Sequence, residues 1–111
     1  LPGMLGSNRG DNMSKFLVLW NLEPSLLGPA AIKAVLSMPA YAAKLIKDGK
    51  LEKRYHVVGK HGGAWIYDVD SNEELDLCLA LAPVYNFSRY EVIALAEMKD
   101  PNTVANDIGD N

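Results

Sequence analysis

The residues best suited to chemistry lie in the extended-looking segment 51–60. His56 is the strongest candidate by type, because the unperturbed pKa of an imidazole lies nearest neutrality and such a group can take a proton from carbon and return it nearby. Arg54 precedes it by two residues, so both side chains share one face of a strand. A guanidinium there can hold a substrate carboxylate through two hydrogen bonds. The alternative is that His56 is an ordinary residue of a sheet face or an interface.

A second polar pair, Arg89 and Glu91, has the same spacing. Glu91 could share the proton transfer with His56, and Arg89 could help to bind substrate; the two could instead form a structural ion pair at a sheet interface. Aromatic residues are numerous for a chain of this length, and those that the core does not need could wall an apolar ligand pocket. The aromatic residues taken as substrate-binding candidates are Trp20, Tyr41 and Tyr67.

The sequence favours neither a metal site nor a nucleotide-binding loop. His56 and His61 are five residues apart, which along one strand points them to opposite faces. The acidic residues of segment 68–76 lack the spacing of a calcium loop, and most precede or open a helix, where the helix dipole favours negative charge. Gly59, Gly62 and Gly63 match no nucleotide motif and indicate a hairpin turn.

The composition limits the function classes. A chain of 111 residues suits one domain with one core. The net charge of −3, without a basic cluster, argues against broad nucleic-acid binding. No apolar run approaches the roughly 20 residues of a membrane span. Cys78 is the only cysteine, so no intrachain disulfide can form, which fits a cytoplasmic protein.

Hydrophobic periodicity predicts strands at about 16–20, 51–60, 64–69 and 87–98, and helices at about 29–48 and 72–82. Pro39 lacks an amide hydrogen and is expected to break the first helix into two pieces. Ser71 and Glu74 form a capping box at the start of the second helix. The apolar face predicted for the first helix consists of Ile32, Val35, Leu36, Pro39, Ala43 and Ile46.

The resulting order is β-α-β-β-α-β, which right-handed crossovers turn into an α+β fold: a four-stranded antiparallel sheet with both helices on one face. The other face carries apolar residues that need a cover. We expect a second copy to cover it, sheet against sheet, in a homodimer; Leu77 and Leu81 favour a higher homo-oligomer. Residues 13–98 form this domain, residues 1–12 are expected to be a disordered or artificially added leader, and residues 99–111 a loose C-terminal tail.

With this order, residues 37–92 resemble the muconolactone isomerase family, small ferredoxin-like proteins that form dimeric α+β barrels. The resemblance rests on Tyr41-Ala42, Asp48-Gly49-Lys50, Val57-Val58-Gly59, the run from Ile66 to Leu75, Leu81-Ala82-Pro83, the aromatic pair Tyr85 and Phe87, and Glu91-Val92.

The resemblance implies an enzyme that moves a double bond in a small unsaturated lactone by proton transfer, without metal or organic cofactor, in a pocket of the barrel. The sequence departs from the family at Ser37-Met38-Pro39, which contains no carboxylate, whereas the isomerases are charged there. This departure favours an alternative, a non-catalytic dimeric ligand-binding or accessory protein of the same fold. A cofactor-free oxygenase of the same architecture is a further alternative, which nothing in the residues selects.

Overall fold

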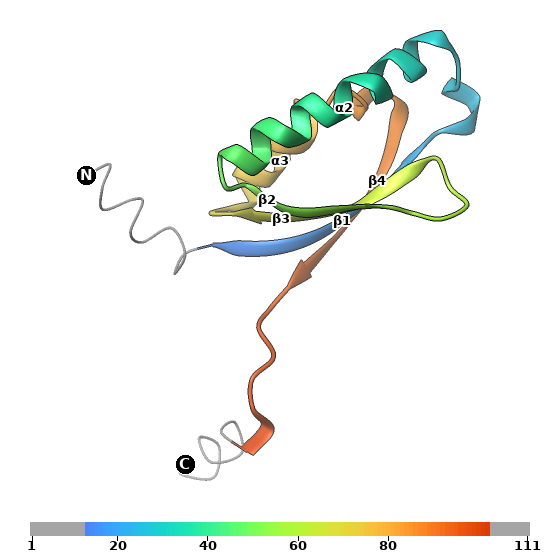
Figure 1. The fold of residues 1–111 in the computed structure, drawn as a ribbon. Coiled ribbons are helices and arrows are strands. Elements are labelled where there is room, and N and C mark those ends of the chain that lie inside the picture. The colour runs from blue at the N-terminus through green and yellow to red at the C-terminus, as the bar shows by residue number, and fades with distance from the viewer. Residues whose placement is uncertain (1–12, 103–111) are drawn as a thin grey trace.

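The computed structural model describes residues 13–102 of the chain (Figure 1). Both the expected leader, 1–12, and the distal part of the expected tail, 103–111, lie outside the described residues. The main elements follow the predicted order, and they are β1 (Ser14–Leu22), α2 (Pro29–Lys47), β2 (Leu51–His56), β3 (Gly62–Val69), α3 (Asn72–Ala80) and β4 (Ser88–Leu95), with short 3-10 turns η1 (Pro24–Leu26) and η2 (Tyr85–Phe87).

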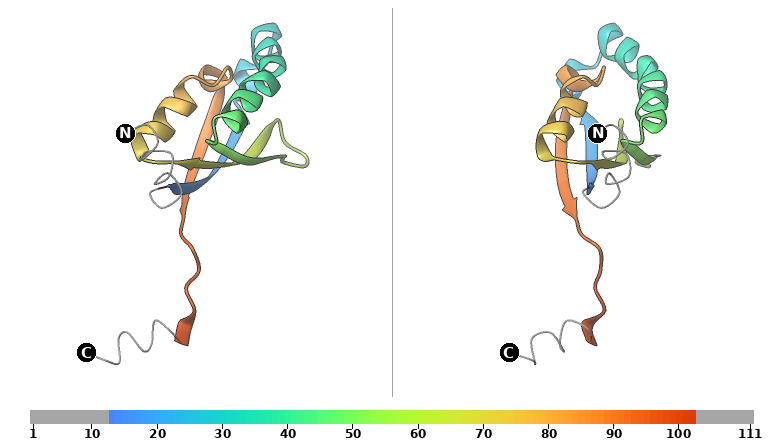
Figure 2. Two further views of the ribbon diagram at one scale, coloured as in Figure 1. Left: turned by 60° about the vertical axis from the view of Figure 1, so that its left-hand side comes forward. Right: turned by 90° about the vertical axis from the view of Figure 1, so that its left-hand side faces the viewer.

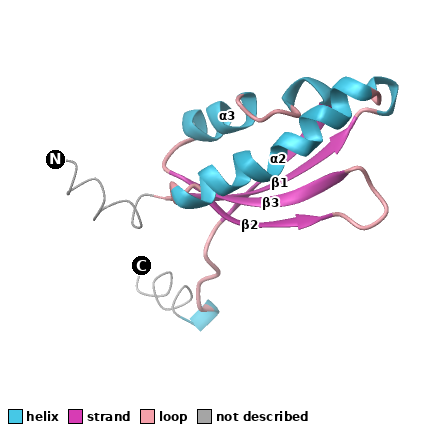
Figure 3. Cartoon of the chain, turned by 45° about the horizontal axis from the view of Figure 1, so that its top comes forward, coloured by secondary structure: helices cyan, strands magenta, loops and turns pink. Residues whose placement is uncertain are grey.

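The four strands form one antiparallel sheet in the order β2-β3-β1-β4. Both helices lie on the same side of this sheet, as Figures 2 and 3 show. We call the helix-covered side the inner face and the opposite side the outer face. Val18 pairs with Trp65 on β3 and with Val92 on β4, so these three residues share the inner face.

The core lies between the inner face and the two helices. The fully or nearly fully buried side chains include Phe16 and Val18 of β1, Met38, Ala42 and Leu45 of α2, Trp65, Tyr67 and Val69 of β3, and Leu75, Cys78 and Leu79 of α3. Each large apolar side chain buried in this way contributes roughly 1.5–3 kcal/mol. Cys78 is thus a buried core residue.

The prediction that Pro39 breaks the first helix is wrong. Helix α2 is continuous from Pro29 to Lys47 with Pro39 inside it. The missing amide removes one bond of the helix ladder, but Met38, Ala42 and Leu45 are buried and hold the helix against the sheet around that position. Tertiary packing therefore outweighs the local cost of the proline.

The prediction of the apolar face of α2 is only partly correct, because most of that face does not pack on the sheet. Val35 packs against the core, but Ile32, Leu36 and Ile46 are 58%, 75% and 51% exposed. The buried positions are Ala31, Met38, Ala42 and Leu45, a seam shifted by one residue. Small residues in that seam let the helix come close to the sheet, and the bulkier neighbours point outward.

Local chemistry sets the ends of both helices where the sequence places them. The Ser71 hydroxyl oxygen accepts from the Glu74 amide at 3.0 Å, and the Glu74 carboxylate accepts in return from the Asp70 amide at 3.0 Å. At the end of α2, Gly49 has a φ of 75°, and the Lys50 amide donates to the Leu45 carbonyl at 2.9 Å. This is the pairing of a Schellman motif, which requires a residue such as glycine.

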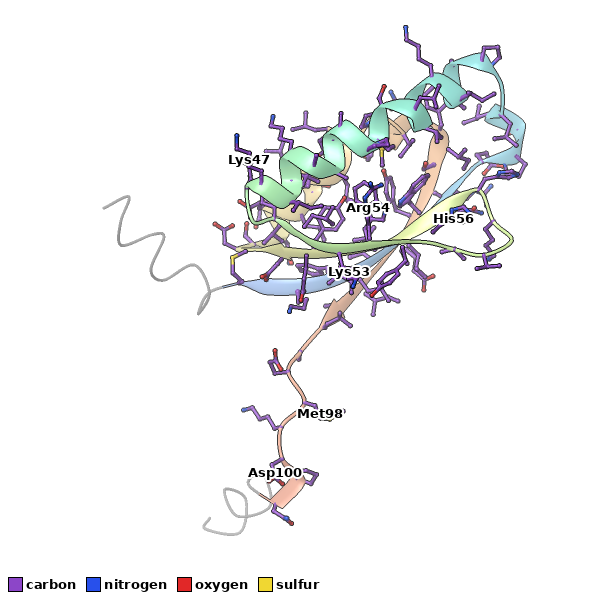
Figure 4. The ribbon with its side chains drawn as sticks, viewed as in Figure 1. Lys47, Lys53, Arg54, His56, Met98 and Asp100 are labelled. Atoms are coloured by element: carbon purple, nitrogen blue, oxygen red, sulfur yellow. The ribbon has the colours of Figure 1, made fainter. Side chains whose placement is uncertain are left out.

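Among residues 13–102, no segment covers the outer face. Leu17 and Leu19 of β1 are half-buried, and Ile93 and Leu95 of β4 are 37% and 40% exposed. The apolar run of β1 predicts burial on both faces, but the described part of the chain covers only the inner one. Strand β4 ends at Leu95, and the residues that follow leave the sheet, with Met98 94% exposed (Figures 1 and 4). Within residues 13–102, no helix combines the length and apolarity needed to cross a membrane.

Candidate functional site

A cavity of about 280 Å³ opens on the inner face between α2 and the β2–β3 hairpin. We call it the inner cavity. Its lining residues are Trp20 and Leu22 of β1, Val35, Met38 and Pro39 of α2, Arg54 and His56 of β2, and His61, Gly62 and Trp65 of the hairpin and β3. The wall is thus mostly apolar and aromatic, and its charged or titratable groups come from one hairpin.

Arg54 and His56 reach the cavity from the same face of β2. Arg54 pairs with Trp65 and His56 with Gly63, so both positions face the helix side. The Arg54 guanidinium carbon lies 5.9 Å from the centre of the Trp65 ring, within the range of a cation–π interaction. Figure 4 shows Arg54 between α2 and the sheet and His56 farther along β2. Both side chains are exposed, so they stand at the mouth of the cavity.

Two indole rings form the aromatic wall. Trp20 and Trp65 pack edge to face, with ring centres 6.3 Å apart and planes at 83°. Gly63 makes room for them, because a Cβ atom at that position would lie 2.8 Å from the Trp20 Nε1 atom and 2.9 Å from the Trp65 Nε1 atom. The Trp20 indole N–H is buried and has no hydrogen-bond partner among residues 13–102, so within them the wall holds an unsatisfied donor.

Tyr41 and Tyr67 belong to the core and do not line the inner cavity. The Tyr41 hydroxyl donates to the Cys78 carbonyl and so ties α2 to α3. Burial raises the pKa of Tyr41 to about 12 and that of Tyr67 further still. Both phenols therefore stay neutral at physiological pH, and their place in the core indicates packing roles.

Arg89 and Glu91 lie on the other side of the sheet. Glu91 pairs with Leu19 and Arg89 with Asn21, which places both on the outer face. They line a separate depression of about 240 Å³, and the Arg89 guanidinium pairs with the Glu23 carboxylate. His56 and Glu91 are thus on opposite faces, and within one chain the structure does not bring them together on a single ligand.

His61 is a cavity residue that the sequence interpretation leaves without a role. Spacing along a single strand puts His56 and His61 on opposite faces, but the hairpin reverses the chain between them and both line the inner cavity. The His61 carbonyl accepts from the Leu22 amide at 2.8 Å, which holds the turn against β1. The glycines that follow His61 are the sequence signal for this reversal.

The chemical character of the inner cavity is cationic and apolar. Of the described residues that line it, Arg54, His56 and His61 are charged or titratable, and none is a carboxylate. Among residues 13–102, no three His, Cys, Asp or Glu side chains gather in a way that could hold a metal ion. The arrangement can bind an anion at the mouth and place an apolar body against the indoles, with imidazoles as the groups that can move a proton.

The sequence profile described as muconolactone delta-isomerase matches residues 16–100. The chain belongs to the muconolactone delta-isomerase family. This confirms the family to which the residue blocks of segment 37–92 point, and the match extends beyond both ends of that segment.

Similar proteins of known name agree with this assignment. Muconolactone delta-isomerases from Acinetobacter baylyi and Cupriavidus pinatubonensis are each 35% identical to the chain, over 68 and 65 residues. These alignments cover 61% and 59% of the chain and 69% and 68% of the relatives.

A crystal structure of muconolactone isomerase matches with a TM-score of 0.68 at 22% identity, over 78% of this chain and 92% of that one. At this identity the match shows the shared fold. The predicted ferredoxin-like α+β class is therefore confirmed.

Proposed function

We propose that the chain is a cofactor-free isomerase that moves a carbon–carbon double bond in a small unsaturated lactone or carboxylate by proton transfer. The observation that carries the proposal is the inner cavity, where Arg54 and His56 stand on one face of β2 opposite two indole rings. Membership of the muconolactone delta-isomerase family supports the reaction type. Muconolactone is the first substrate to test, because the relatives are named for it.

The size and polarity of the cavity fit such a ligand. A volume of about 280 Å³ lies at the small end of ligand pockets. The substrate carboxylate binds the Arg54 guanidinium at the mouth, where two parallel hydrogen bonds fix its orientation. The lactone ring then lies deeper, against Met38, Pro39 and the indoles, where apolar contact excludes water.

In the proposed mechanism His56 makes both proton transfers. Its neutral imidazole takes the proton from the ring carbon adjacent to the double bond, and the C–H electron pair moves into the conjugated lactone. The double bond shifts by one position, and the imidazolium returns the proton to the former double-bond carbon that adjoins the lactone carbonyl. One base suffices, because both carbons belong to one small ring and a single imidazole can reach them from the same face. Glu91 has no place in this step within one chain, since it is on the outer face.

The decisive variant is His56→Ala, with His61→Ala as its matched control in the same cavity. General acid–base catalysis contributes about 10²–10⁴-fold, so His56→Ala should lower kcat by at least about 100-fold. His61→Ala should leave kcat within a few-fold of wild type. The assay follows the ultraviolet absorbance of muconolactone. Equal rates for wild type and His56→Ala would reject the role of His56.

The proposed active form is a homodimer that pairs the two outer faces. Its support is the row of half-exposed apolar side chains that include Leu17, Leu19, Ile93 and Leu95. Arg89 and Glu91 then lie in this interface. We expect Leu19→Lys to sediment as a monomer, whereas Leu26→Lys, which changes an exposed leucine in η1, keeps the wild-type size. A monomeric wild type at micromolar concentration would refute the dimer.

One observation favours a second function, that of a non-catalytic binding protein in the same fold. The described residues that line the inner cavity include no carboxylate, and His56 is exposed in a single chain. Such a protein would bind muconolactone with quenching of tryptophan fluorescence but would not change its ultraviolet absorbance over hours. We place the protein in the cytoplasm in either case, because its single cysteine allows no intrachain disulfide.

A further inference from the structure

The wall of the inner cavity contains an unpaired hydrogen-bond donor. Among residues 13–102, three buried polar side-chain atoms have no hydrogen-bond partner, and they are Trp20 Nε1, Ser88 Oγ and Tyr90 Oη. Of these three residues, Trp20 alone lines the inner cavity. A buried donor without a partner destabilises a fold, so its presence in a native protein indicates a partner from outside the chain. At the wall of a candidate active site, that partner is an atom of the ligand.

Strand pairing places this donor next to the proposed base. Trp20 of β1 pairs with Gly63 of β3, and Gly63 pairs on its other side with His56 of β2. The three residues therefore form one row across the inner face. A Cβ atom on Gly63 would lie 2.8 Å from Trp20 Nε1, so the indole nitrogen lies over Gly63, the neighbour of His56. The donor and the imidazole thus belong to the same part of the cavity.

The second indole directs its nitrogen to the same place. Trp65 Nε1 would lie 2.9 Å from the same Cβ atom, so the nitrogen-bearing edges of both rings converge over Gly63. Only glycine leaves the space that these two edges occupy. An indole N–H donates a hydrogen bond and cannot accept one. The ligand atom that fits this place is therefore an acceptor, such as a carbonyl oxygen.

We propose that the Trp20 N–H donates a hydrogen bond to the carbonyl oxygen of the lactone and stabilises the negative charge that develops there. This role rests on the proposed isomerase function. When His56 takes the ring proton, the C–H electron pair moves through the conjugated system onto the carbonyl oxygen, which becomes an enolate oxygen. The electron pair returns when the imidazolium gives its proton to carbon, and the Trp20 proton stays on nitrogen throughout. Trp20 thus acts as a donor of an oxyanion hole.

The two ends of the ligand are then held by different groups. Arg54 binds the carboxylate at the mouth, and Trp20 binds the carbonyl oxygen over Gly63. Trp20 Nε1 is buried, whereas the Arg54 side chain is exposed and packs on the Trp65 ring (Figure 4). The ligand reaches the nitrogen when Arg54 turns from this ring to the carboxylate. The site thereby selects small carboxylates that also carry a lactone or other carbonyl group.

Trp20→Phe removes the N–H and keeps an aromatic ring. Loss of one oxyanion-hole donor lowers kcat by about 10²–10³-fold, so we expect kcat for muconolactone to fall at least about 100-fold while KM changes only a few-fold. Tyr90→Phe is the matched control, because it removes another unpaired buried donor, at the position paired with Trp20 but outside the cavity lining. Its kcat should equal that of wild type. Circular dichroism checks that both variants fold.

Nuclear magnetic resonance tests the contact without any substitution of Trp20. The chain has two tryptophans and therefore two indole N–H signals, and sequential assignment identifies the one from Trp20. The measurement uses His56→Ala, which is expected to bind muconolactone without converting it. Saturating muconolactone should move the Trp20 N–H proton signal downfield, because a hydrogen bond to oxygen deshields the proton.

The outcomes separate the role of Trp20 from the isomerase function. Turnover by wild type with an unshifted Trp20 signal, or with an unchanged kcat in Trp20→Phe, overturns the role of Trp20 and leaves the isomerase function intact. A shifted Trp20 signal without turnover by wild type supports the carbonyl contact and rejects the isomerase function. Neither turnover nor a shift overturns both.

Discussion

Replacing Arg54 by alanine tests how the inner cavity binds its ligand. A hydrogen bond to a charged group contributes about 1.5–3 kcal/mol, and Arg54 is exposed at the cavity mouth, where water weakens the interaction. The lower part of that range, about 1.5–2 kcal/mol, corresponds to a 10- to 30-fold increase in the Kd of muconolactone. Arg54→Lys should fall between wild type and Arg54→Ala, because it keeps the charge but loses the planar, bidentate donor.

The matched control is the neighbouring cation, Lys53. Its ammonium lies 5.6 Å from the centre of the Tyr55 ring, and Figure 4 shows it on the opposite side of the sheet from Arg54. Lys53→Ala removes the same charge from the same strand without touching the cavity. We expect the Kd of this variant to stay within about twofold of wild type, because salt screens an exposed charge on the opposite side of the sheet from the cavity.

Tryptophan fluorescence gives a direct assay. The chain has two tryptophans, Trp20 and Trp65, and both line the inner cavity, so the emission reports on its occupant. Arg54→Ala changes the surroundings of Trp65 and hence the size of the signal, but the midpoint of the titration still gives the Kd. If Arg54→Ala and Lys53→Ala weaken binding equally, general electrostatic attraction accounts for the effect and the proposed carboxylate contact is refuted.

The remaining predictions concern stability. Ser71→Ala removes the cap of α3 and should lower the free energy of unfolding in urea by about 1 kcal/mol; no change would show that the cap contributes nothing. Gly62→Ala would place its Cβ 1.9 Å from the Trp20 carbonyl oxygen, so the Tm should fall sharply, and an unchanged Tm would contradict the close β1–β3 approach. Tyr90→Phe removes a buried hydroxyl that has no partner in the described part of the chain, and it should raise the free energy of unfolding or leave it unchanged. Tyr41→Phe loses a hydrogen bond and should lower the free energy of unfolding by about 1 kcal/mol. The pKa of Tyr41 is raised to about 12, while an unfolded tyrosine titrates near 10, so its stabilising contribution is complete below about pH 10 and is lost as the pH rises toward 12. Tyr41→Phe should therefore lose less stability than wild type between pH 9 and pH 11 in urea unfolding, and an equal loss would exclude this cause.

The order of the elements and the helix ends follow from local chemistry. Alternating and helical apolar periods identify the strands and helices without tertiary information. Ser71 with Glu74 marks the start of α3, and Gly49 marks the end of α2, because each satisfies backbone groups of its own helix. These interactions join residues that are close in the sequence, so they can be predicted from the sequence alone.

In helix α2, the local sequence does not determine which face is buried. Its sequence contains two neighbouring apolar seams, and the larger residues Ile32 and Leu36 suggest that their seam faces the core. The sheet instead takes the seam with Ala31 and Ala42, which allows close approach, and the same burial carries the helix through Pro39. The choice depends on the shape of the sheet surface, which no single segment encodes.

The geometry of the candidate site likewise follows partly from the sequence and partly from the tertiary structure. Alternation along a strand predicts from the sequence that Arg54 and His56 share a face and that Arg89 and Glu91 share a face. Only the strand pairing and the side covered by the helices decided that these faces are opposite, which separates His56 from Glu91. The hairpin likewise brought His61 to the cavity. Periodicity is a property of one strand, whereas the face that lines a cavity is set by how all the strands and helices pack together.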